Sequence, residues 1–339
     1  MNQSVVRLVA SDPAFRLEGR VDTRDASSPV LIWQGTSVRA DFEGDAVTLC
    51  FGAAKGVSFF DFEVDGAARV ITVNEGSAPV RIKYPTPLSA GRHQLKLFKR
   101  SEADAGYVTF LGIELPACAR IYSPESVTQN LIFQFFGDSI TVGACNEDGA
   151  VDQWENRATH NNALSYGALT AKALNAAHRN VAVSGMGIVA GYVPKCAGQI
   201  WNKLYPEPDA AKSDERGWVP NVVFVNYGEN DDSFSKNQNM EFPAGFADSY
   251  VTLVQNMRET YPHAEIVLLN GGMFGGAKSE PLRKAWTAAV QRLETADLHV
   301  HHYIFQHWSE THPRVSDHRA MAKELVIWLK SQRFMQRFL

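Results

Sequence analysis

The residue with the clearest potential for chemistry is Ser139, which closely follows an apolar run. Five of the six residues in the run 131–136 are apolar, which is typical of a central parallel strand covered on both faces. Gly137 lacks a Cβ and therefore permits a sharp exit from that strand. A serine on such a turn presents its hydroxyl at the carboxyl edge of a sheet, where ligands of open α/β folds bind. The segment predicts a nucleophile, although Gly-Asp-Ser is also common turn chemistry.

Two later loops offer hydrogen-bond donors for a tetrahedral oxyanion. Residues 184–187 form a Ser-Gly-Met-Gly loop with unobstructed backbone, and residues 228–231 contain the side-chain amide of Asn230. We predict that the backbone N–H groups of Ser139 and Gly185 act together with this amide as an oxyanion hole. Losing one such donor typically lowers turnover by about 10²–10³-fold. Each segment by itself is also typical of a plain turn.

A serine hydroxyl needs a base to take its proton, and the chain offers one near its carboxyl end. His312 lies in a predicted loop ahead of the last helix, whereas His318 is expected to be a structural or capping residue at the start of that helix. The other ring nitrogen of His312 needs an orienting partner. Glu310 is the nearest carboxylate, and a backbone carbonyl, such as that of Trp308 or Thr311, would also serve.

The elements that must position these residues fall into two parts of a chain of 339 residues, which is longer than one core usually grows. Residues 1–122 contain short runs rich in β-branched and aromatic residues, which predicts an all-β jelly-roll sandwich. Residues 123–130 are expected to link it to the second part. In residues 131–339 predicted strands alternate with helices, which indicates a three-layer α/β/α domain around a parallel sheet.

Composition argues against several classes of function. A net charge of −4 gives no electrostatic reason to expect nucleic acid or an anionic membrane as partner. No stretch approaches the roughly 18 apolar residues of a membrane-spanning helix. The amino terminus lacks the pattern of a secretory signal, so we expect a cytoplasmic protein, or a secreted or periplasmic one if a signal has been removed. The 4 scattered cysteines predict neither a zinc knuckle nor a disulfide framework.

Two other patterns raise alternatives. A group of histidines near the carboxyl end would be compatible with zinc: His299, His301, His302 and His307. No cysteine or carboxylate spacing completes a ligand set around them, so we predict no metal and no cofactor. The glycine-rich stretch 271–276 follows a predicted strand but lacks the Lys-Ser/Thr of a P-loop, and we expect it to form a flexible wall of the cleft.

The serine, glycine, asparagine and histidine segments together resemble the four blocks of the SGNH (GDSL) hydrolases, in that family's order. The resemblance extends to family 2 of the carbohydrate esterases, deacetylases of plant polysaccharides that join an amino-terminal jelly roll to an SGNH domain. It covers nearly the whole chain, and is carried by the segments 32–38, 41–44, 99–102, 164–174, 218–226 and 312–313.

This resemblance implies that Ser139 is the nucleophile, that His312 is the base, and that Ser139, Gly185 and Asn230 supply the oxyanion donors. The chain departs from the family's pattern in two places. Ser309 stands where an aspartate is common, three residues before the histidine, and Glu229 stands where threonine is frequent. The carboxylate of Glu229 is expected either to disfavour anionic substrates or to bind a sugar hydroxyl.

We therefore predict a carboxylic ester hydrolase that removes acetyl groups from an acetylated oligo- or polysaccharide, such as xylan or mannan, through an acetyl-enzyme on Ser139. Trp308, Tyr227 and Glu229 are expected to contact the sugar, although buried aromatic residues are the common alternative. A lipid or thioester hydrolase of the same superfamily stays open, disfavoured because no apolar lid segment is found. A catalytically silent carbohydrate-binding protein also stays open. The sugar, the acetylated position and the oligomeric state are not predicted.

Overall fold

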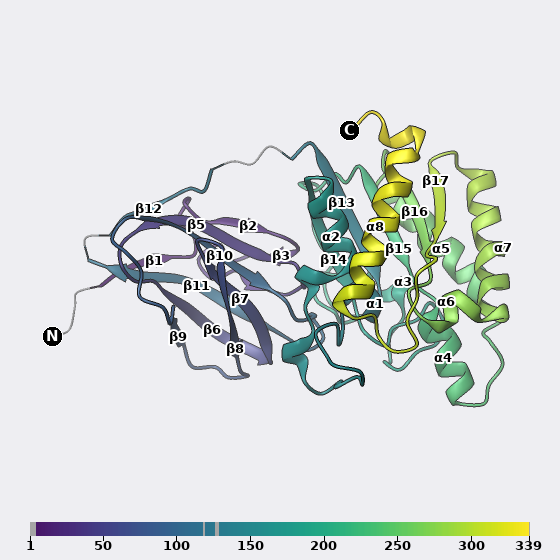
Figure 1. The fold of residues 1–339 in the computed structure, drawn as a ribbon, viewed down its shortest axis with the longest axis horizontal. Coiled ribbons are helices and arrows are strands. Elements are labelled where there is room, and N and C mark those ends of the chain that lie inside the picture. Colours follow the sequence, from purple (N-terminus) through teal and green to yellow (C-terminus); the bar gives the residue numbers. More distant parts are fainter. Residues whose placement is uncertain (1–4, 118, 126–128, 339) are drawn as a thin grey trace. The chain divides into compact units, whose positions relative to one another are not determined.

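The computed structural model describes residues 5–117, 119–125 and 129–338 (Figure 1). Its contacts divide the chain into two compact units, Met1–Thr128 and Gln129–Leu339. The first unit contains antiparallel sheets, whereas the second contains a parallel sheet with helices on both of its faces.

Two antiparallel sheets make up the first unit. One has the strand order β3-β4-β11-β6-β9 with β1 beside β11, and the other has the order β12-β5-β10-β7-β8 with β2 beside β5. The strands are β1 (Val5–Val9), β2 (Arg16–Glu18), β3 (Val21–Asp22), β4 (Val30–Leu31), β5 (Ser37–Glu43), β6 (Thr48–Gly56), β7 (Ser58–Val64), β8 (Ala67–Val73), β9 (Val80–Lys83), β10 (Arg92–Lys99), β11 (Gly106–Pro116) and β12 (Ile121–Tyr122).

Aromatic side chains from both sheets meet in the core of this unit. Along β7 every second residue is buried, which is the alternation expected of a strand with one face on a core. Phe60 of β7 stacks on Phe51 of β6, with ring centroids 5.7 Å apart, and Phe51 also contacts Phe110 of β11 edge-on at 6.3 Å. The predicted β-sandwich is confirmed.

The second unit is built on a parallel sheet with the order β14-β13-β15-β16-β17. Its strands are β13 (Leu131–Gly137), β14 (Ala176–Ala182), β15 (Val222–Asn226), β16 (Glu265–Asn270) and β17 (Val300–Ile304). After β13 the chain forms β14 on one side of β13, and it later forms β15 on the other side of β13. In open parallel sheets, ligands bind at the carboxyl ends of the strands next to such a reversal of strand order.

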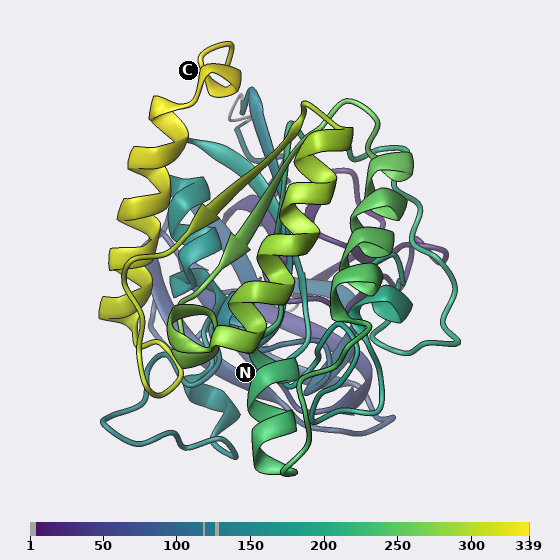
Figure 2. The same cartoon turned by 90° about the vertical axis from the view of Figure 1, so that its right-hand side faces the viewer.

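Helices cover both faces of this sheet (Figure 2), with α2 and α8 on one face and α5 and α7 on the other. The α-helices of this unit are α1 (Ser139–Val142), α2 (Tyr166–Ala173), α3 (Ala197–Ile200), α4 (Glu229–Asn237), α5 (Phe246–Thr260), α6 (Phe274–Lys278), α7 (Glu280–Ala296) and α8 (Val315–Ser331). Short 3-10 helices, labelled η, are η1 (Arg157–Thr159), η2 (Asn162–Leu164) and η3 (Arg333–Met335). Within the described residues, no helix has the length and apolarity needed to cross a membrane.

Strand β13 is buried on both of its faces, as its sequence predicts. Phe135 stacks on Phe224 with ring centroids 4.5 Å apart and contacts Tyr166 of α2. The next residue, Phe136, points to the opposite face, where its ring contacts Trp201 and Tyr261. The expected α/β domain with a parallel sheet is confirmed.

Two expectations about helices were wrong. Residues 228–231 were expected to form a loop, but helix α4 begins at Glu229, directly after Gly228. The stretch 271–276 was expected to be a flexible wall, but its second half opens the short helix α6. A contact across the fold caps α6, because the carboxylate of Glu229 accepts hydrogen bonds from the N–H groups of Gly275 and Gly276 at 2.9 and 3.1 Å. Such a contact has no local signal in the sequence.

Candidate active site

Ser139 is the first residue of α1, immediately beyond the carboxyl end of β13. Asp138 caps this helix, since its Oδ1 accepts a hydrogen bond from the N–H of Ile140 at 3.1 Å. A Cβ on Gly137 would collide with the side chain of Thr141, so only glycine allows the helix to start this close to the strand. The serine is thus held on a tight strand-to-helix turn, 4% exposed.

A buried polar layer supports this turn from beneath. The carbonyl of Thr141 accepts from the side-chain amides of Asn162 and Asn180 at 3.2 and 2.9 Å, and its hydroxyl bonds to the hydroxyl of Tyr166 at 2.9 Å. His318 of α8 accepts a hydrogen bond from the N–H of Tyr166 through Nδ1 at 3.1 Å. His318 is therefore structural, as expected, and burial lowers its pKa to about 3, which keeps its ring neutral.

Two of the three predicted oxyanion donors are backbone groups at the carboxyl ends of neighbouring strands. Ser139 follows β13, and Gly185 follows β14 in a loop where its φ of 77° requires the left-handed region. The carbonyl of Gly185 accepts from the N–H of Tyr192 at 2.8 Å, which closes the loop. Among the described residues no acceptor binds the N–H of Ser139 or that of Gly185. Backbone N–H groups without an acceptor are suited to receive an anionic oxygen, and here Ser139 is buried whereas Gly185 is half-buried.

The third predicted donor, Asn230, connects the three segments. Its Nδ2 donates to Oδ2 of Asp138 at 3.1 Å and to the carbonyl of Met186 at 3.2 Å. The amide therefore ties the serine turn and the loop after β14 to the first turn of α4. Burial, together with the charges of Glu229 and Asp231, raises the pKa of Asp138 to about 8.

Three acidic residues in the first turn of α4 each hold a different segment. Asp231 accepts hydrogen bonds from the consecutive N–H groups of Ile188, Val189 and Ala190 at 2.8, 2.8 and 3.0 Å. Asp232 bonds to Ser279 and pairs with Lys236 at 2.6 Å. Burial raises the pKa of Asp231 to about 6 although these N–H groups favour its charged form. The loop that carries Gly185 is thus fixed by Asp231.

Glu229 does not have the position expected of a residue that contacts substrate. Both of its carboxylate oxygens are occupied by the backbone of α6, and burial raises the pKa of its carboxyl. The prediction that Glu229 binds a sugar hydroxyl is therefore corrected, whereas the alternative that its charge disfavours anionic substrates stays a prediction. A carboxylate that caps a neighbouring helix in this way is a structural group.

His312 lies between β17 and α8, and its orienting partner is Asp152 rather than Glu310. The Nδ1 atom of His312 lies 2.7 Å from Oδ2 of Asp152, and the backbone N–H of His312 points to the same oxygen at 3.4 Å. No contact joins Glu310 to His312 within the described part of the chain, and Glu310 is exposed. The prediction of Glu310 was wrong because Asp152 already occupies the Nδ1 edge of the ring, whereas the Glu310 side chain is exposed.

Asp152 is set up to act as an anion. Its second oxygen, Oδ1, forms an ion pair with Nη1 of Arg314 at 2.7 Å. Partial burial raises the pKa of Asp152, but hydrogen bonds from His312 and Arg314 outweigh this effect and hold that pKa well below its usual range. The ring of Trp154 lies against the His312 ring with centroids 5.5 Å apart, and the guanidinium of Arg157 covers Trp154 at 4.1 Å. The histidine is therefore held on one edge and one face.

The loop that carries Asp152 is fastened at both ends. Asn146 exchanges two hydrogen bonds with the backbone of Asn161, at 2.8 and 3.0 Å. Arg314 donates to the carbonyls of Cys145 and Gly149 at 3.1 and 2.7 Å. These contacts connect the segment after α1 to the segment after His312. Sequence reasoning missed Asp152 because the polar loop 147–155 holds several carboxylates, and only the folded loop shows which one reaches the ring.

The two predicted sugar-contacting aromatic residues differ in exposure. Tyr227 is 2% exposed, so its ring cannot offer a stacking face, and that prediction is corrected. Trp308 is half-buried and contacts the ring of Phe274 edge-on at 6.2 Å, with Nζ of Lys278 over the indole at 5.2 Å. Phe274 is itself 46% exposed. Trp308 thus keeps the exposure that contact with a ligand requires.

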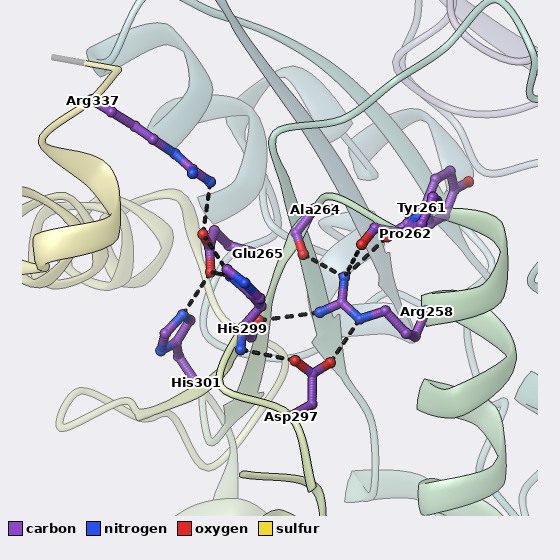
Figure 3. A network of polar contacts seen from close by, with 9 residues as sticks. All are labelled: Arg258, Tyr261, Pro262, Ala264, Glu265, Asp297, His299, His301 and Arg337. Atoms are coloured by element: carbon purple, nitrogen blue, oxygen red, sulfur yellow. Dashed lines mark hydrogen bonds and ion pairs between the residues drawn. The ribbon is translucent and has the colours of Figure 1, made fainter.

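The histidines weighed for zinc pair with three different carboxylates. His299 and His301 both reach Glu265, at 3.2 and 2.9 Å, and Arg337 contacts the same carboxylate at 2.7 Å (Figure 3). The other two pair elsewhere, His302 with Glu294 at 2.6 Å and His307 with Asp317 at 2.8 Å. Glu265 is the first residue of β16, so the network in Figure 3 lies at the amino end of the strands, away from the carboxyl edge that carries Ser139.

Comparison with known proteins gives this arrangement a family. Residues 135–321, more than half of the chain, match the model of the GDSL-like lipase/acylhydrolase family. The chain belongs to this family. Residues 17–124 match the carbohydrate esterase 2 N-terminal domain, so the GDSL-like domain here follows the partner domain that the sequence resemblance predicted. The expected ester-hydrolase class is thereby confirmed.

This GDSL-like protein is similar along most of its length to curated relatives. It is 29% identical over 333 residues to the cellulase/esterase CelE of Acetivibrio thermocellus, which covers 95% of this chain but only 40% of CelE. It is 28% identical over 323 residues to an acetylxylan esterase / glucomannan deacetylase of Cellvibrio japonicus, covering 89% of this chain and 85% of that protein. The chain thus spans about two fifths of CelE.

Solved structures share the two-domain fold. A family two carbohydrate esterase from Clostridium thermocellum, solved in complex with cellohexaose, is 28% identical and has a TM-score of 0.82, covering 93% of this GDSL-like chain and 98% of that one. A family two carbohydrate esterase from Cellvibrio japonicus is 24% identical with a TM-score of 0.83, covering 98% of each chain. These likenesses support the sandwich and the α/β unit as a recurring pair.

Proposed function

We propose that this chain is a serine esterase that removes O-acetyl groups from carbohydrates. Ser139 is the nucleophile, His312 is the general base and Asp152 orients His312. The N–H groups of Ser139 and Gly185, with the amide of Asn230, bind the oxyanion. The carboxylic ester hydrolase class follows from the family, whereas these residue roles and the acetylated sugar are the proposal.

One observation carries the assignment, namely the 2.7 Å contact between Nδ1 of His312 and the carboxylate of Asp152. A neutral imidazole bears one proton, and an ionised carboxylate on Nδ1 keeps that proton on Nδ1. The lone pair then resides on Nε2, which is the state that a general base needs. The Asp152 charge also stabilises the imidazolium that forms when Nε2 takes a proton.

The first half of the reaction forms the acetyl-enzyme. Nε2 of His312 takes the proton of the Ser139 hydroxyl as Oγ attacks the acetyl carbonyl carbon, and the carbonyl oxygen becomes an oxyanion. The N–H groups of Ser139 and Gly185 donate to this oxyanion. The Asn230 amide shares the hydrogen that it now directs at the Met186 carbonyl, since an oxyanion is the stronger acceptor. The C–O bond to the sugar then breaks, and the sugar oxygen takes the proton from His312.

The second half releases acetate. Water gives a proton to Nε2 of His312 while its oxygen attacks the acetyl carbonyl carbon, and the same donors stabilise the second oxyanion. The bond between the carbonyl carbon and Oγ breaks, and the proton on His312 returns to Ser139. Each cycle therefore consumes one ester and one water and yields one alcohol and one acetic acid, with no metal or cofactor in any step.

Two lines of support favour an acetylated carbohydrate as substrate. A relative named acetylxylan esterase / glucomannan deacetylase covers 89% of this chain, and a similar solved structure holds cellohexaose. In this chain the exposed ring of Phe274 and the half-buried ring of Trp308 offer apolar faces of the kind on which sugar rings pack, beside the cations Lys236 and Lys278.

The test is hydrolysis of 4-nitrophenyl acetate, butyrate and octanoate, followed by acetate release from acetylated xylan and glucomannan. We expect acetate to be preferred, since each added methylene must find room in the site, and Ser139→Ala to remove activity by at least about 10³-fold. Ser309→Ala is the matched control, a serine in the histidine segment with no assigned role, and it should retain activity. Preference for octanoate would overturn the deacetylase in favour of a lipid esterase. Folded protein without turnover of any ester would leave a carbohydrate-binding protein.

A further inference from the structure

Cys145 is a buried thiol beside the proposed catalytic pair that the esterase mechanism does not use. Its Sγ, a carboxylate oxygen of Asp152 and a ring nitrogen of His312 all lie within 4.8 Å of one another. Sγ also lies 3.4 Å from Nε2 of His160. The side chains of Cys145 and His160 are both 0% exposed. Four metal-binding side chains thus converge around one thiol at the carboxyl edge of the sheet.

We propose that Cys145, Asp152 and His312, with His160 as a fourth ligand, bind Zn²⁺ or a similar thiophilic divalent cation, and that this binding switches the esterase off. The inhibition rests on the proposed function, because it requires His312 to be the base. The cation site itself rests only on the positions of the four side chains.

The donor set is the kind that zinc selects. Thiolate, imidazole and carboxylate together are typical of tetrahedral zinc, with bonds of about 2.0–2.1 Å to nitrogen and about 2.3 Å to sulfur. In a tetrahedral site these bond lengths place the ligand atoms about 3.3–3.8 Å apart. The ligand atoms of Cys145, Asp152 and His312 therefore need to move by only about one ångström to close around an ion, and His160 must approach that ion from its position 3.4 Å from the thiol.

His160 contacts the cluster through Nε2, which lies 3.4 Å from Sγ of Cys145. Its other ring nitrogen, Nδ1, is buried without a hydrogen-bond partner in the described structure, so the ring makes no competing hydrogen bond on that edge. A neutral imidazole is the form that coordinates metals.

The surroundings of the thiol favour a cation. The thiolate is the form of cysteine that coordinates metals, so cation binding must release the Cys145 proton to solvent. The carboxylates of Asp152 and Asp148 act electrostatically on this thiol, and their negative charges favour a cation beside it.

A bound cation removes the base whichever ring nitrogen of His312 it takes. On Nε2 it occupies the lone pair that accepts the serine proton. On Nδ1 it displaces the proton from that nitrogen, and the one proton of the neutral ring then resides on Nε2, where it blocks the same role. Arg314 pairs with Oδ1 of Asp152, so the cation would take Oδ2, the oxygen that now faces His312.

The test combines a binding signal and an activity signal. Co²⁺ is added to the chelator-treated protein, and a thiolate-to-cobalt charge-transfer band is sought by absorption. The hydrolysis of 4-nitrophenyl acetate is then measured with increasing Zn²⁺, and the rate of each variant is divided by its own rate without metal. Adding chelator afterwards should restore the rate. We expect the cobalt band in wild type and its absence in Cys145→Ser, which should also need about 10–100-fold more Zn²⁺ for half inhibition. His160→Gln should shift that midpoint in the same direction.

Cys196→Ser is the matched control, because this half-buried cysteine lies outside the cluster and its loss should change neither signal. Absence of the cobalt band in wild type, or equal zinc sensitivity of wild type and Cys145→Ser, overturns the proposal. If Cys145→Ser fails to fold, Cys145→Ala gives the same comparison. A cobalt band that depends on Cys145 in a chain without esterase activity would support the cation site and reject the proposed function instead.

Discussion

Opposite ends of one parallel sheet carry two histidine–carboxylate clusters made of the same residue types. At the carboxyl edge, Asp152 binds His312 at 2.7 Å and Arg314 at 2.7 Å. At the amino edge, Glu265 binds His299, His301 and Arg337, the last also at 2.7 Å (Figure 3). Pairing chemistry alone does not distinguish them, since each joins imidazole and guanidinium to one carboxylate.

The two clusters differ in the groups that surround the other edge and the faces of each histidine ring. His301 stacks on Phe334 with ring centroids 4.1 Å apart, and Glu265 is 2% exposed, so this cluster fastens the last helical turn to the sheet. His312 is held on one edge by Asp152 and on one face by Trp154, and it follows the carboxyl end of β17, the edge of the sheet at which Ser139 follows β13. We propose that only the pair at this edge is reactive, because ligands of open parallel sheets bind at the carboxyl ends of the strands.

Asp152→Asn should give the largest effect, on catalysis. An amide on Nδ1 no longer favours the tautomer with its lone pair on Nε2, and it does not stabilise the imidazolium. We expect kcat for 4-nitrophenyl acetate to fall by about 10³–10⁴-fold with little change in KM. Steady-state kinetics on protein with an unchanged urea midpoint measures this, and a loss smaller than tenfold would mean that Asp152 is a structural partner like Glu265.

How far the sequence predicts this site depends on the distance of each contact along the chain. Ser139, Gly185, Asn230 and His312 lie in short segments next to predictable strands or ahead of the last helix, so a parallel sheet places all four at its carboxyl edge. Asp152 was not predicted, because it reaches His312 across 160 residues from an irregular loop. Its position depends on side-chain contacts that no local pattern encodes, such as those of Asn146 with Asn161.

The same reasoning explains the corrected substrate contacts. Glu229 follows a strand at the correct edge, and sequence alone makes it a candidate for the ligand. The fold turns its carboxylate onto Gly275 and Gly276 instead, 46 and 47 residues away. Strand and helix periods depend on neighbouring residues and were predicted well, whereas the direction of a polar side chain at a helix start depends on what the rest of the fold brings near.

His318→Asn tests a third kind of histidine, buried and neutral, through the pH dependence of stability. The folded-state pKa of His318 is lowered from 6.5 to about 3, so the unfolded chain takes up the proton first. The stability from the neutral ring is complete above about pH 6.5 and is lost as pH falls towards 3. Asparagine keeps an acceptor for the Tyr166 N–H but does not titrate. The gap in unfolding free energy between wild type and variant should shrink by up to about 1.4 kcal/mol per pH unit below 6.5.

Urea unfolding of both proteins between pH 7 and pH 5 measures this gap, with His307→Asn as the control because His307 is half-exposed and pairs with Asp317. A gap that stays constant or widens on acidification would show that His318 is protonated in the fold.

Glu265→Gln should change stability and leave catalysis intact. The amide keeps the shape of the side chain but loses the charge that holds Arg337 and the two histidines, so the unfolding free energy should fall by about 1–3 kcal/mol. Because the cluster lies at the amino edge of the strands, kcat should stay within about twofold of wild type. Urea midpoints and ester kinetics on the same preparations separate the two quantities. A catalytic loss like that of Asp152→Asn would contradict the division between the two ends of the sheet.

Glu310→Ala should give the smallest effect, and it is the matched control for Asp152→Asn. Both residues carry a carboxylate, but Glu310 is exposed, and of the two only Asp152 bonds to the His312 ring. Removing an exposed carboxylate without a structural partner typically changes stability by less than about 0.5 kcal/mol, and kcat should remain within about twofold of wild type. Kinetics of Asp152→Asn, Glu310→Ala and the double variant measure the coupling. If Glu310→Ala reduced kcat strongly, or deepened the defect of Asp152→Asn, Glu310 would orient His312 during the reaction, and the proposed triad would need to include it.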